Sequence, residues 1–329
     1  MKDLTHLGER RIIELIQSRL DPMPRMPVPF NDDVAAYEIA KGNLVVLKTD
    51  MLVGKTDVPK SMTLWQAARK AVIMNVSDFA AKGVQPISAL VSLGLPESFD
   101  EKDIEQIGEG LNAGARQYGA YIIGGDTGEA SDLVIAIAMF GMAEKEALML
   151  RNGAKPGDIV AVTGPFGKTS AGLRILIRKF EAADEIKEVL VNSVLMPNAR
   201  LKEGLILCQT KSVTAAIDSS DGLAWSLHEL ARASGVGMSL EKLPIAVEAQ
   251  RFASANKIDP ATLALYGGEE YELVLTVKSE MWRKAETAVK RTGGSLLRIG
   301  EVTSGTSIVL ETSGKMTEIP SKGYEHFKK

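Results

Sequence analysis

The stretch Ile217-Asp218-Ser219-Ser220-Asp221-Gly222-Leu223 lies between an apolar run and an amphipathic one. The run at 213–217 predicts a short buried strand, and the leucines from Leu223 onward recur at helical spacing. Two carboxylates therefore stand where a strand leads into a helix, a place where ligands gather in α/β sheets and where free N–H groups attract anions. A plainer interpretation is equally open at this point: Ser219 or Ser220 caps the helix, and the acids offset its dipole.

Length and composition indicate a two-domain protein. The 329 residues exceed what one ordinary core holds. Hydrophobic residues make up 45% and charged residues 25%, values typical of soluble globular proteins. The formal net charge of −3 gives no support for nucleic acid or an anionic membrane as a partner. Because neither a membrane-spanning run nor a signal-peptide core is visible, we expect a cytoplasmic protein.

The single cysteine and the three histidines narrow the possible chemistry. Cys208 lies in an apolar helical pattern, and we interpret it as a buried small hydrophobe rather than a nucleophile. One cysteine and three scattered histidines exclude a structural zinc site. Oxygen ligands are the chemistry that remains.

The first half of the chain alternates predicted helices and strands. Residues 3–20 predict an amphipathic helix with Leu4, Leu7, Leu15 and Ile16 on one side, ended by the prolines at 22–29. Thr63 and Gln66 have the form of a capping box that opens a helix to about Lys82, and Gly83 is placed to end it. The other elements we expect are a helix at 100–118 and strands at 44–50, 87–95, 120–123 and 133–142.

The helix at 63–82 carries two polar groups in an apolar stretch. Residues 71–81 are apolar nearly all round, which predicts burial on most sides. Asn75 and Asp78 stand three residues apart on one face. A buried carboxylate is costly unless it is paired, hydrogen-bonded or metal-bound. Asp78 is therefore either a site residue or half of an internal hydrogen-bonded pair with Asn75.

A turn at 155–158 separates the halves, and we place the two domains at 1–148 and 149–329. The second half predicts strands at 158–163 and 213–217, helices at 168–180 and 198–210, and a helix after Gly222. A smaller unit is expected to close the chain, with a strand at 271–276, a helix at 279–291 and two short strands before Lys322.

Six aspartates share one setting, the end of an apolar element or a glycine turn: Asp33, Asp50, Asp78, Asp126, Asp218 and Asp221. If they converge, cations must hold them ionised in one cleft. With no Cys or His nearby, Mg²⁺ is the natural ion, bound by few carboxylates together with water and phosphate oxygens. Such a cleft suits a polyphosphate substrate, so phosphoryl transfer is the leading reaction class. Asp32 and Asp33 cannot both face one site without a bend, so we expect only one of them to be a ligand.

One loop has part of a phosphate-binding motif. Residues 163–169 end in Gly-Lys-Thr after a strand, but two residues instead of four separate Gly164 from Gly167. We interpret this loop as a tight turn before a helix, with Lys168 solvated. No G-x-G-x-x-G follows a strand, so neither a Rossmann site nor a protein-kinase glycine loop is predicted.

Eight stretches in order carry a resemblance that runs from Phe30 to Phe327. Together they resemble the thiamine-monophosphate kinase family, whose superfamily includes aminoimidazole-ribonucleotide synthetase and selenophosphate synthetase. The stretches are NDDVA at 31–35, KTDMLV at 48–53, NVSDFAAKG at 75–83, GGDT at 124–127, RNGAKPGD at 151–158, DSSDGL at 218–223, GGEEYEL at 267–273 and GYEHF at 323–327.

The resemblance implies an enzyme that transfers the γ-phosphoryl of ATP to thiamine monophosphate, giving thiamine diphosphate, and that works as a homodimer. It implies a two-domain α+β fold, with an N-terminal mixed sheet and helices forming a dimer barrel and a C-terminal α/β sandwich-like domain. It implies Mg²⁺ ligands at Asp33, Asp50, Asp78, Asp126, Asp218 and Asp221, with Lys48 and Thr49 adding backbone or hydroxyl oxygens. It assigns ATP to Gly125, Asp126, Arg151 and Ser220, and thiamine monophosphate to Asp57, Glu269 and Tyr324.

Two positions depart from the family pattern. Asn31 stands where the family usually has Gly before the paired acids, and Asn tolerates the left-handed conformation better than most residues. Glu270 stands where the second acid after the glycine pair is commonly Asp, while the substrate contact is assigned to Glu269.

The expected mechanism needs no catalytic base, because the phosphate of thiamine monophosphate, with a second pKa of about 6, is largely ionised at neutral pH. In-line positioning of two anions and Mg²⁺ would carry a direct transfer without a phosphoenzyme. Three alternatives remain: another ATP-using enzyme of the superfamily, a non-catalytic Mg²⁺-nucleotide-binding relative, and a structural protein with solvated turn acids. The chain has no Cys before Cys208, which argues against selenophosphate synthetase, a family that usually has a reactive Cys or selenocysteine near its N-terminus.

Overall fold

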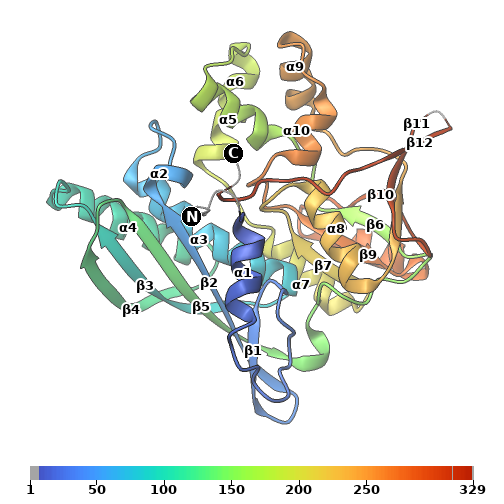
Figure 1. Ribbon diagram of the computed structural model, residues 1–329, viewed down its shortest axis with the longest axis horizontal. Helices are drawn as coiled ribbons and strands as arrows, with labels where there is room; N and C mark the ends of the chain where they lie inside the picture. The colour runs from blue at the N-terminus through green and yellow to red at the C-terminus, as the bar shows by residue number, and fades with distance from the viewer. Residues whose placement is uncertain (1–6, 313, 328–329) are drawn as a thin grey trace.

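Two sheets, one in each half of the chain, form the frame of the protein (Figure 1). The computed structural model describes residues 7–312 and 314–327. Over those residues, no helix is long and apolar enough to cross a membrane. The strand order is β1-β2-β5-β3-β4 in the first sheet and β12-β11-β8-β10-β6-β9-β7 in the second. With helices beside both sheets, the chain has the predicted α+β fold.

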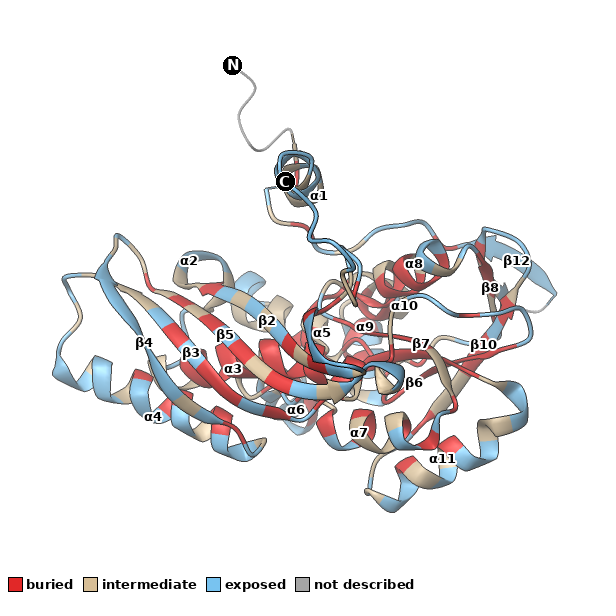
Figure 2. Cartoon of the chain, turned by 90° about the horizontal axis from the view of Figure 1, so that it is seen from below, coloured by how far each residue is buried: buried red, intermediate tan, exposed pale blue. Residues whose placement is uncertain are grey.

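The first sheet is mixed, because β3 and β4 run parallel while the other neighbours are antiparallel. Helices α3 and α4 cover one of its faces. Figure 2 shows the contrast between the buried residues of α3 and the exposed residues along β4 and α4. The elements of this half are α1 (Glu9–Gln17), β1 (Ala35–Ala40), β2 (Asn43–Val53), α2 (Gly54–Asp57), α3 (Leu64–Lys82), β3 (Pro86–Leu95), α4 (Glu101–Gln117), β4 (Tyr121–Glu129), β5 (Val134–Glu144) and the 3-10 turn η2 (Lys145–Ala147).

The second sheet contains the strand that was expected to belong to a smaller closing unit. That strand, β9, is buried along its length and lies between β6 and β7, so the prediction of a separate unit is wrong. The elements of this half are β6 (Ile159–Val162), α5 (Lys168–Arg178), α6 (Asp184–Leu195), α7 (Leu201–Thr210), β7 (Val213–Asp218), α8 (Leu223–Ser234), β8 (Gly237–Leu240), α9 (Val247–Ala255), α10 (Pro260–Tyr266), β9 (Leu273–Val277), η3 (Ser279–Met281), α11 (Trp282–Arg291), β10 (Leu297–Thr303), β11 (Ile308–Thr312) and β12 (Lys315–Glu318).

Helix α3 lies between the two halves, packed against β2 and β5 on one side and against α7 and β7 on the other. Both predicted ends are confirmed: Thr63 and Gln66 form a capping box, and Gly83 ends the helix with a φ of 67°. The predicted burial on most sides is confirmed as well. One apolar core runs through both halves, including Val76 of α3 and Leu275 of β9. The division of the chain at residues 148 and 149 stays a prediction.

The first helix and the cap of α8 differ from the prediction. Helix α1 begins only at Glu9, after Gly8 with a φ of 71°, and it ends at Gln17. Leu15 and Ile16 are exposed, and Leu4 lies outside the described residues. Helix α8 begins at Leu223, directly after Gly222 as predicted, but no side chain caps it. The buried Ser219 hydroxyl makes no hydrogen bond within the described residues, so the alternative of a serine cap is wrong.

The strand expected at 120–123 is too short. Strand β4 continues through the Gly-Gly-Asp sequence to Glu129, pairing with β3 along the way. Gly125 permits this pairing because a Cβ there would lie 1.9 Å from the carbonyl oxygen of Val91. Asp126 therefore stands inside an edge strand and not at the end of one. The sequence patterns also missed β1, β8 and helices α6, α9 and α10.

Candidate active site

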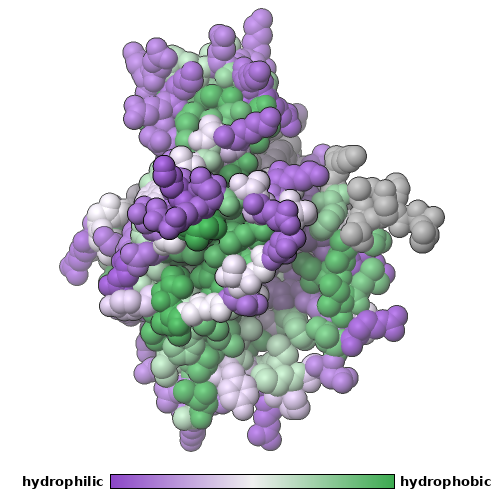
Figure 3. Space-filling view, turned by 90° about the vertical axis from the view of Figure 1, so that its left-hand side faces the viewer, coloured by the Kyte–Doolittle hydropathy of each residue, from purple (hydrophilic) through white to green (hydrophobic). Residues whose placement is uncertain are grey.

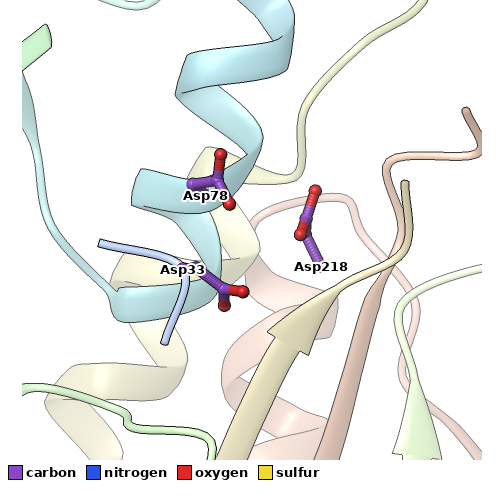
Figure 4. A group of neighbouring side chains, drawn as sticks. All are labelled: Asp33, Asp78 and Asp218. Carbon is purple, nitrogen blue, oxygen red and sulfur yellow. The ribbon is translucent and has the colours of Figure 1, made fainter. Parts of the chain in front are cut away.

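Three buried aspartates meet where the two halves of the chain join (Figure 4). Asp33 precedes β1, Asp78 belongs to α3, and Asp218 ends β7. One carboxylate oxygen from each lies within 4.8 Å of the others. Three hard oxygen donors at this spacing fit a Mg²⁺ ion, which favours carboxylates supplemented by water and phosphate. The fold thus brings together three of the six aspartates singled out in the sequence.

Two cations hold the Asp33 end of this cluster. Lys82 Nζ lies 2.8 Å from Asp33 Oδ2 and 2.7 Å from Asp32 Oδ1. Arg151 donates from Nε to Asp33 Oδ1 at 2.7 Å. Both acids therefore face Lys82. The three aspartates that could hold a metal include Asp33 and not Asp32, and the expectation that only one of the two acids is a ligand stays a prediction. The chain bends at Asn31, whose φ of 70° is the left-handed conformation that its residue type tolerates.

A third cation bridges two further acids. Lys48 Nζ lies 3.2 Å from Asp50 Oδ1 and 3.0 Å from Asp78 Oδ2. Lys48 thus contacts the site with its ammonium group. The prediction from the sequence included only an oxygen atom of Lys48 as a metal ligand and did not include these ion pairs. Neighbouring Thr49 is exposed on the opposite face of β2, because successive side chains of a strand alternate.

The alternative for Asn75, an internal pair with Asp78, is wrong. Asn75 Oδ1 accepts a hydrogen bond from the backbone N–H of Asp50 at 3.2 Å, and its amide donates to the carbonyl of Ala71 at 3.1 Å. Asn75 therefore makes its hydrogen bonds elsewhere, while Asp78 pairs with Lys48 and belongs to the cluster of three aspartates.

Burial sets the electrostatics of the cluster. It raises the pKa of Asp78 well above the ordinary range and raises the pKa of Asp218 to about 7, an effect that the charge of Asp33 reinforces. Burial also tends to raise the pKa of Asp33. The positive charges of Arg151 and Lys82 outweigh this effect and together hold the pKa of Asp33 below its ordinary value. A bound divalent cation would favour the ionised form of all three carboxylates, which is a second reason why the donor set fits Mg²⁺.

Two adjoining cavities lie at the cluster. The smaller, of about 120 Å³, is lined by Asp50, Asp78, Arg151 and Asp218, among others. The larger, of about 540 Å³, is lined on its polar side by Asp57, Asp221, Glu269 and Tyr324. Met74, Ser220 and Tyr271 line both, so the cavities share a wall.

The larger cavity joins a polar side to an apolar one. Val58 and Pro59 from the first half and Leu173 and Leu176 of α5 supply apolar surface. Asp221 lies here and not among the three clustered aspartates, and burial, reinforced by the charge of Glu9, raises its pKa to about 6. A cavity of this size and character accommodates a small molecule that has a ring system and a charged end.

Lys70 is a site residue that sequence reasoning missed. Its ammonium pairs with the Glu269 carboxylate and donates to the carbonyl oxygen of Asp57 at 2.9 Å. Lys82 was missed as well. Both lysines could have been found from the sequence, because they lie in a helix that was predicted to be buried on most sides. A buried charge requires a partner, so each lysine predicts an acidic or polar group beside it.

Most backbone N–H groups of the loop at 163–169 already donate to other groups of the protein. Glu270 Oε1 accepts hydrogen bonds from the backbone N–H of Gly167 at 2.6 Å and of Thr169 at 3.1 Å. The turn-before-helix interpretation is confirmed, since α5 begins at Lys168, although Lys168 is half-buried and not fully solvated. Burial raises the pKa of Glu270 to about 7.

Cys208 is half-buried and donates from Sγ to the carbonyl oxygen of Ala147 at 3.1 Å.

Gly125 and Asp126 do not reach the cluster within one chain. Asp126 pairs with Ser92, whose side chain is on the exposed face of the first sheet, whereas the buried cluster lies on the helix-covered side. Two strands, β5 and β3, also separate β4 from β2. Neither residue lines either cavity.

Comparisons with known proteins agree with this architecture. The family description AIR synthase related protein, N-terminal domain, matches residues 31–143, and the corresponding C-terminal domain matches residues 155–313. Thiamine-monophosphate kinase of Pyrococcus horikoshii is 37% identical over 327 residues, covering 99% of this chain and 98% of that protein. The kinase of the same name from Nitrosopumilus maritimus is 33% identical over 325 residues, covering 99% of this chain and 100% of that protein.

Solved structures extend the likeness to three dimensions. The structure "AaThiL complexed with AMPPCP and TMP" is 30% identical, covers 99% of this chain and 99% of that chain, and superposes with a TM-score of 0.85. The resemblance predicted from the eight sequence stretches is therefore confirmed. The chain belongs to the AIR synthase related proteins and, within them, to the thiamine-monophosphate kinase family.

Proposed function

We propose that this protein transfers the γ-phosphoryl group of ATP to thiamine monophosphate, forming thiamine diphosphate. The observation that carries the proposal is the cluster of Asp33, Asp78 and Asp218 beside two adjoining cavities of unequal size. The complex of a relative with AMPPCP and TMP supports the pairing of a nucleotide with this acceptor.

Mg²⁺ is the proposed metal, and it would neutralise charge on the transferring phosphoryl group. Asp33, Asp78 and Asp218 would hold it, with Asp50 and Asp221 at the adjoining cavity walls. Arg151 and Ser220 border the smaller cavity and are assigned to ATP. Asp57, Glu269 and Tyr324 border the larger cavity and are assigned to thiamine monophosphate.

The side chains at the site have the task of positioning two anions. Ser220 borders both cavities and would touch both substrates. The fixed charges of Lys48 and Arg151 offset repulsion between the acids and incoming phosphate. Because the acceptor oxygen is already ionised, no side chain has to remove a proton, and we propose direct in-line transfer without a covalent intermediate on the protein.

We propose that the working form is a homodimer assembled through the exposed face of the first sheet. Figure 3 shows apolar side chains gathered on this side of the molecule. Met51 belongs to this face and also lines the larger cavity, which brings the face close to the site. A second copy packed here would carry Thr49, Gly125 and Asp126 toward its neighbour's cluster. The exposed apolar residues of the face are Tyr37, Ile39, Leu47, Met51, Ile87, Leu90, Tyr121, Ile123 and Met142.

An acceptor-dependence assay tests the proposed function. ADP release should require Mg²⁺ and thiamine monophosphate together, should not occur with thiamine, and should be abolished by EDTA. Thiamine diphosphate should appear in equal amount by mass spectrometry. Nucleotide binding without any acceptor-dependent ADP release would instead identify a sensor and overturn the proposal. Label from γ-³²P-ATP retained covalently on the protein would overturn direct transfer.

A further inference from the structure

Lys70 lies behind Asp57 and Glu269, two of the acidic residues that line the larger cavity. Its side chain is 1% exposed, and it is not among the residues that line the cavity. Its ammonium contacts the Glu269 carboxylate from the second half and the Asp57 carbonyl from the first. One buried charge thus joins the two sides of the cavity floor.

The Glu269 backbone is held in a conformation that few residue types adopt. Glu269 has a φ of 62° and Tyr271 a φ of 52°, both in the left-handed region. Such conformations persist only where surrounding contacts determine them. Backbone N–H groups of Glu269 and Tyr271 donate to the carbonyls of Ser220 at 2.6 Å and Ser219 at 3.0 Å. These bonds fix the main chain, and Lys70 fixes the side chain.

The pair leaves part of Glu269 available to a ligand. Lys70 contacts Oε1, while no hydrogen bond from the described residues reaches Oε2. The Glu269 side chain is 26% exposed and lines the cavity. A carboxylate held in this way suits the amino or cationic parts of thiamine and repels its phosphate.

We propose that Lys70 is a positioning residue for the acceptor substrate: it holds the Glu269 carboxylate directed into the larger cavity, so that thiamine monophosphate binds there. The inference rests on the proposed function. Since Lys70 acts through Glu269 and the Asp57 segment, its influence falls on the acceptor and not on ATP, to which Arg151 of the smaller cavity is assigned.

Steady-state kinetics of Lys70→Met and Arg69→Met test the inference. Lys70→Met should raise KM for thiamine monophosphate by about tenfold or more while KM for ATP changes by less than about twofold. Arg69 is the matched control, since it is the adjacent buried cation on α3 but contacts Pro197, Gln117 and Asn198. Arg69→Met should lower the unfolding midpoint and leave both KM values unchanged. An equal rise of both KM values in Lys70→Met would overturn the inference.

A double-mutant cycle separates positioning from general stability. In a Glu269→Gln background, Lys70→Met should cause little further rise in KM for thiamine monophosphate, because the group through which Lys70 acts is already neutral. The double variant also keeps the test possible if Lys70→Met alone leaves an unpaired carboxylate and folds poorly. The same fold-increase in both backgrounds would overturn the inference.

Calorimetric titration of thiamine monophosphate distinguishes this inference from the proposed function. A wild-type protein that neither binds nor phosphorylates thiamine monophosphate would overturn the proposed function. A wild-type protein that does both, with an unaltered Kd in Lys70→Met, would overturn only the role of Lys70. The expected result is wild-type binding, with a Kd raised by about tenfold in Lys70→Met and unchanged in Arg69→Met.

Discussion

Ser77 donates a 2.7 Å hydrogen bond to Asp218 Oδ2, which joins helix α3 in the first half to the end of strand β7 in the second. Both residues are buried. The bond favours the ionised form of Asp218 against the effect of burial. One hydroxyl therefore helps to place the carboxylate beside Asp33 and Asp78 and helps to keep it charged.

Removing this hydroxyl should weaken both folding and metal binding. We expect Ser77→Ala to lower the free energy of unfolding by about 1–3 kcal/mol, since Asp218 would lose a buried hydrogen bond. Mg²⁺ affinity should fall because a proton then competes better for Asp218. Urea unfolding with EDTA and a Mg²⁺ titration of activity measure the two effects. Ser193→Ala, which removes a hydroxyl bonded to its own helix, is the control, and an unchanged Mg²⁺ midpoint in Ser77→Ala would contradict the prediction.

Asp218→Asn should separate stability from activity. A neutral amide removes repulsion from Asp33, so the metal-free protein should gain stability while Mg²⁺-dependent turnover falls by orders of magnitude. Asp221→Asn should also reduce turnover and leave folding intact, but with a smaller gain in stability, because Asp221 lies outside the cluster. Unfolding midpoints in EDTA and initial rates with Mg²⁺ give both quantities. A loss of stability in Asp218→Asn would show that the three acids do not repel one another.

Lys82→Met should be strongly destabilising. Lys82 is fully buried, contacts Asp32 and Asp33, and donates to the carbonyl oxygen of Ala216 at 2.8 Å. Removing one partner of a buried ionic group leaves charges uncompensated, which costs about 3–5 kcal/mol. Urea unfolding measures the change against Lys290→Met, whose side chain is 64% exposed and which should shift stability by less than about 0.5 kcal/mol. Similar losses in the two variants would refute this account.

Glu270 should make stability fall as pH rises. Because burial raises the pKa of Glu270 to about 7, the folded protein binds this proton more tightly than the unfolded chain, in which glutamate titrates near about 4.3. The folded state then holds more protons between these values, and stability decreases through that window. Glu270→Gln keeps an acceptor for Gly167 and Thr169, so it should raise the urea midpoint more at pH 8 than at pH 5. A lower midpoint at pH 8 would mean that the charge at the start of α5 outweighs burial.

Subunit mixing should reveal whether Asp126 serves a neighbouring chain. If each site combines Asp126 of one copy with Asp218 of the other, Asp126→Asn and Asp218→Asn are each inactive alone. In a mixed dimer one site carries both substitutions and the other carries none. Random mixing makes half of the dimers mixed, with one intact site of two, so about a quarter of wild-type activity should return. Activity that stays absent after denaturation and joint refolding would rule out this arrangement.

Several features were predictable from the sequence because their causes are local. The capping box at Thr63 and the glycine at Gly83 fix the two ends of α3 within a few residues. The apolar run between them predicts that the helix is buried. The acids that follow apolar elements pointed to Mg²⁺ and phosphoryl chemistry, and eight ordered stretches pointed to the family. Each of these signals requires only residue type and spacing.

Other features depend on contacts between distant residues. The face on which Asp126 stands follows from a register shift between Ala89 and Leu90 of the neighbouring strand, which no local pattern in β4 reveals. Lys70 meets Glu269 across 199 residues, and Lys82 reaches the bend at Asn31 only after α3 has packed between the halves. The sequence by itself determined the kinds of groups and the elements that carry them. The tertiary structure alone decided which charges share a site, because the burial that makes each charge costly, and so selects its partner, arises only when both halves close around α3.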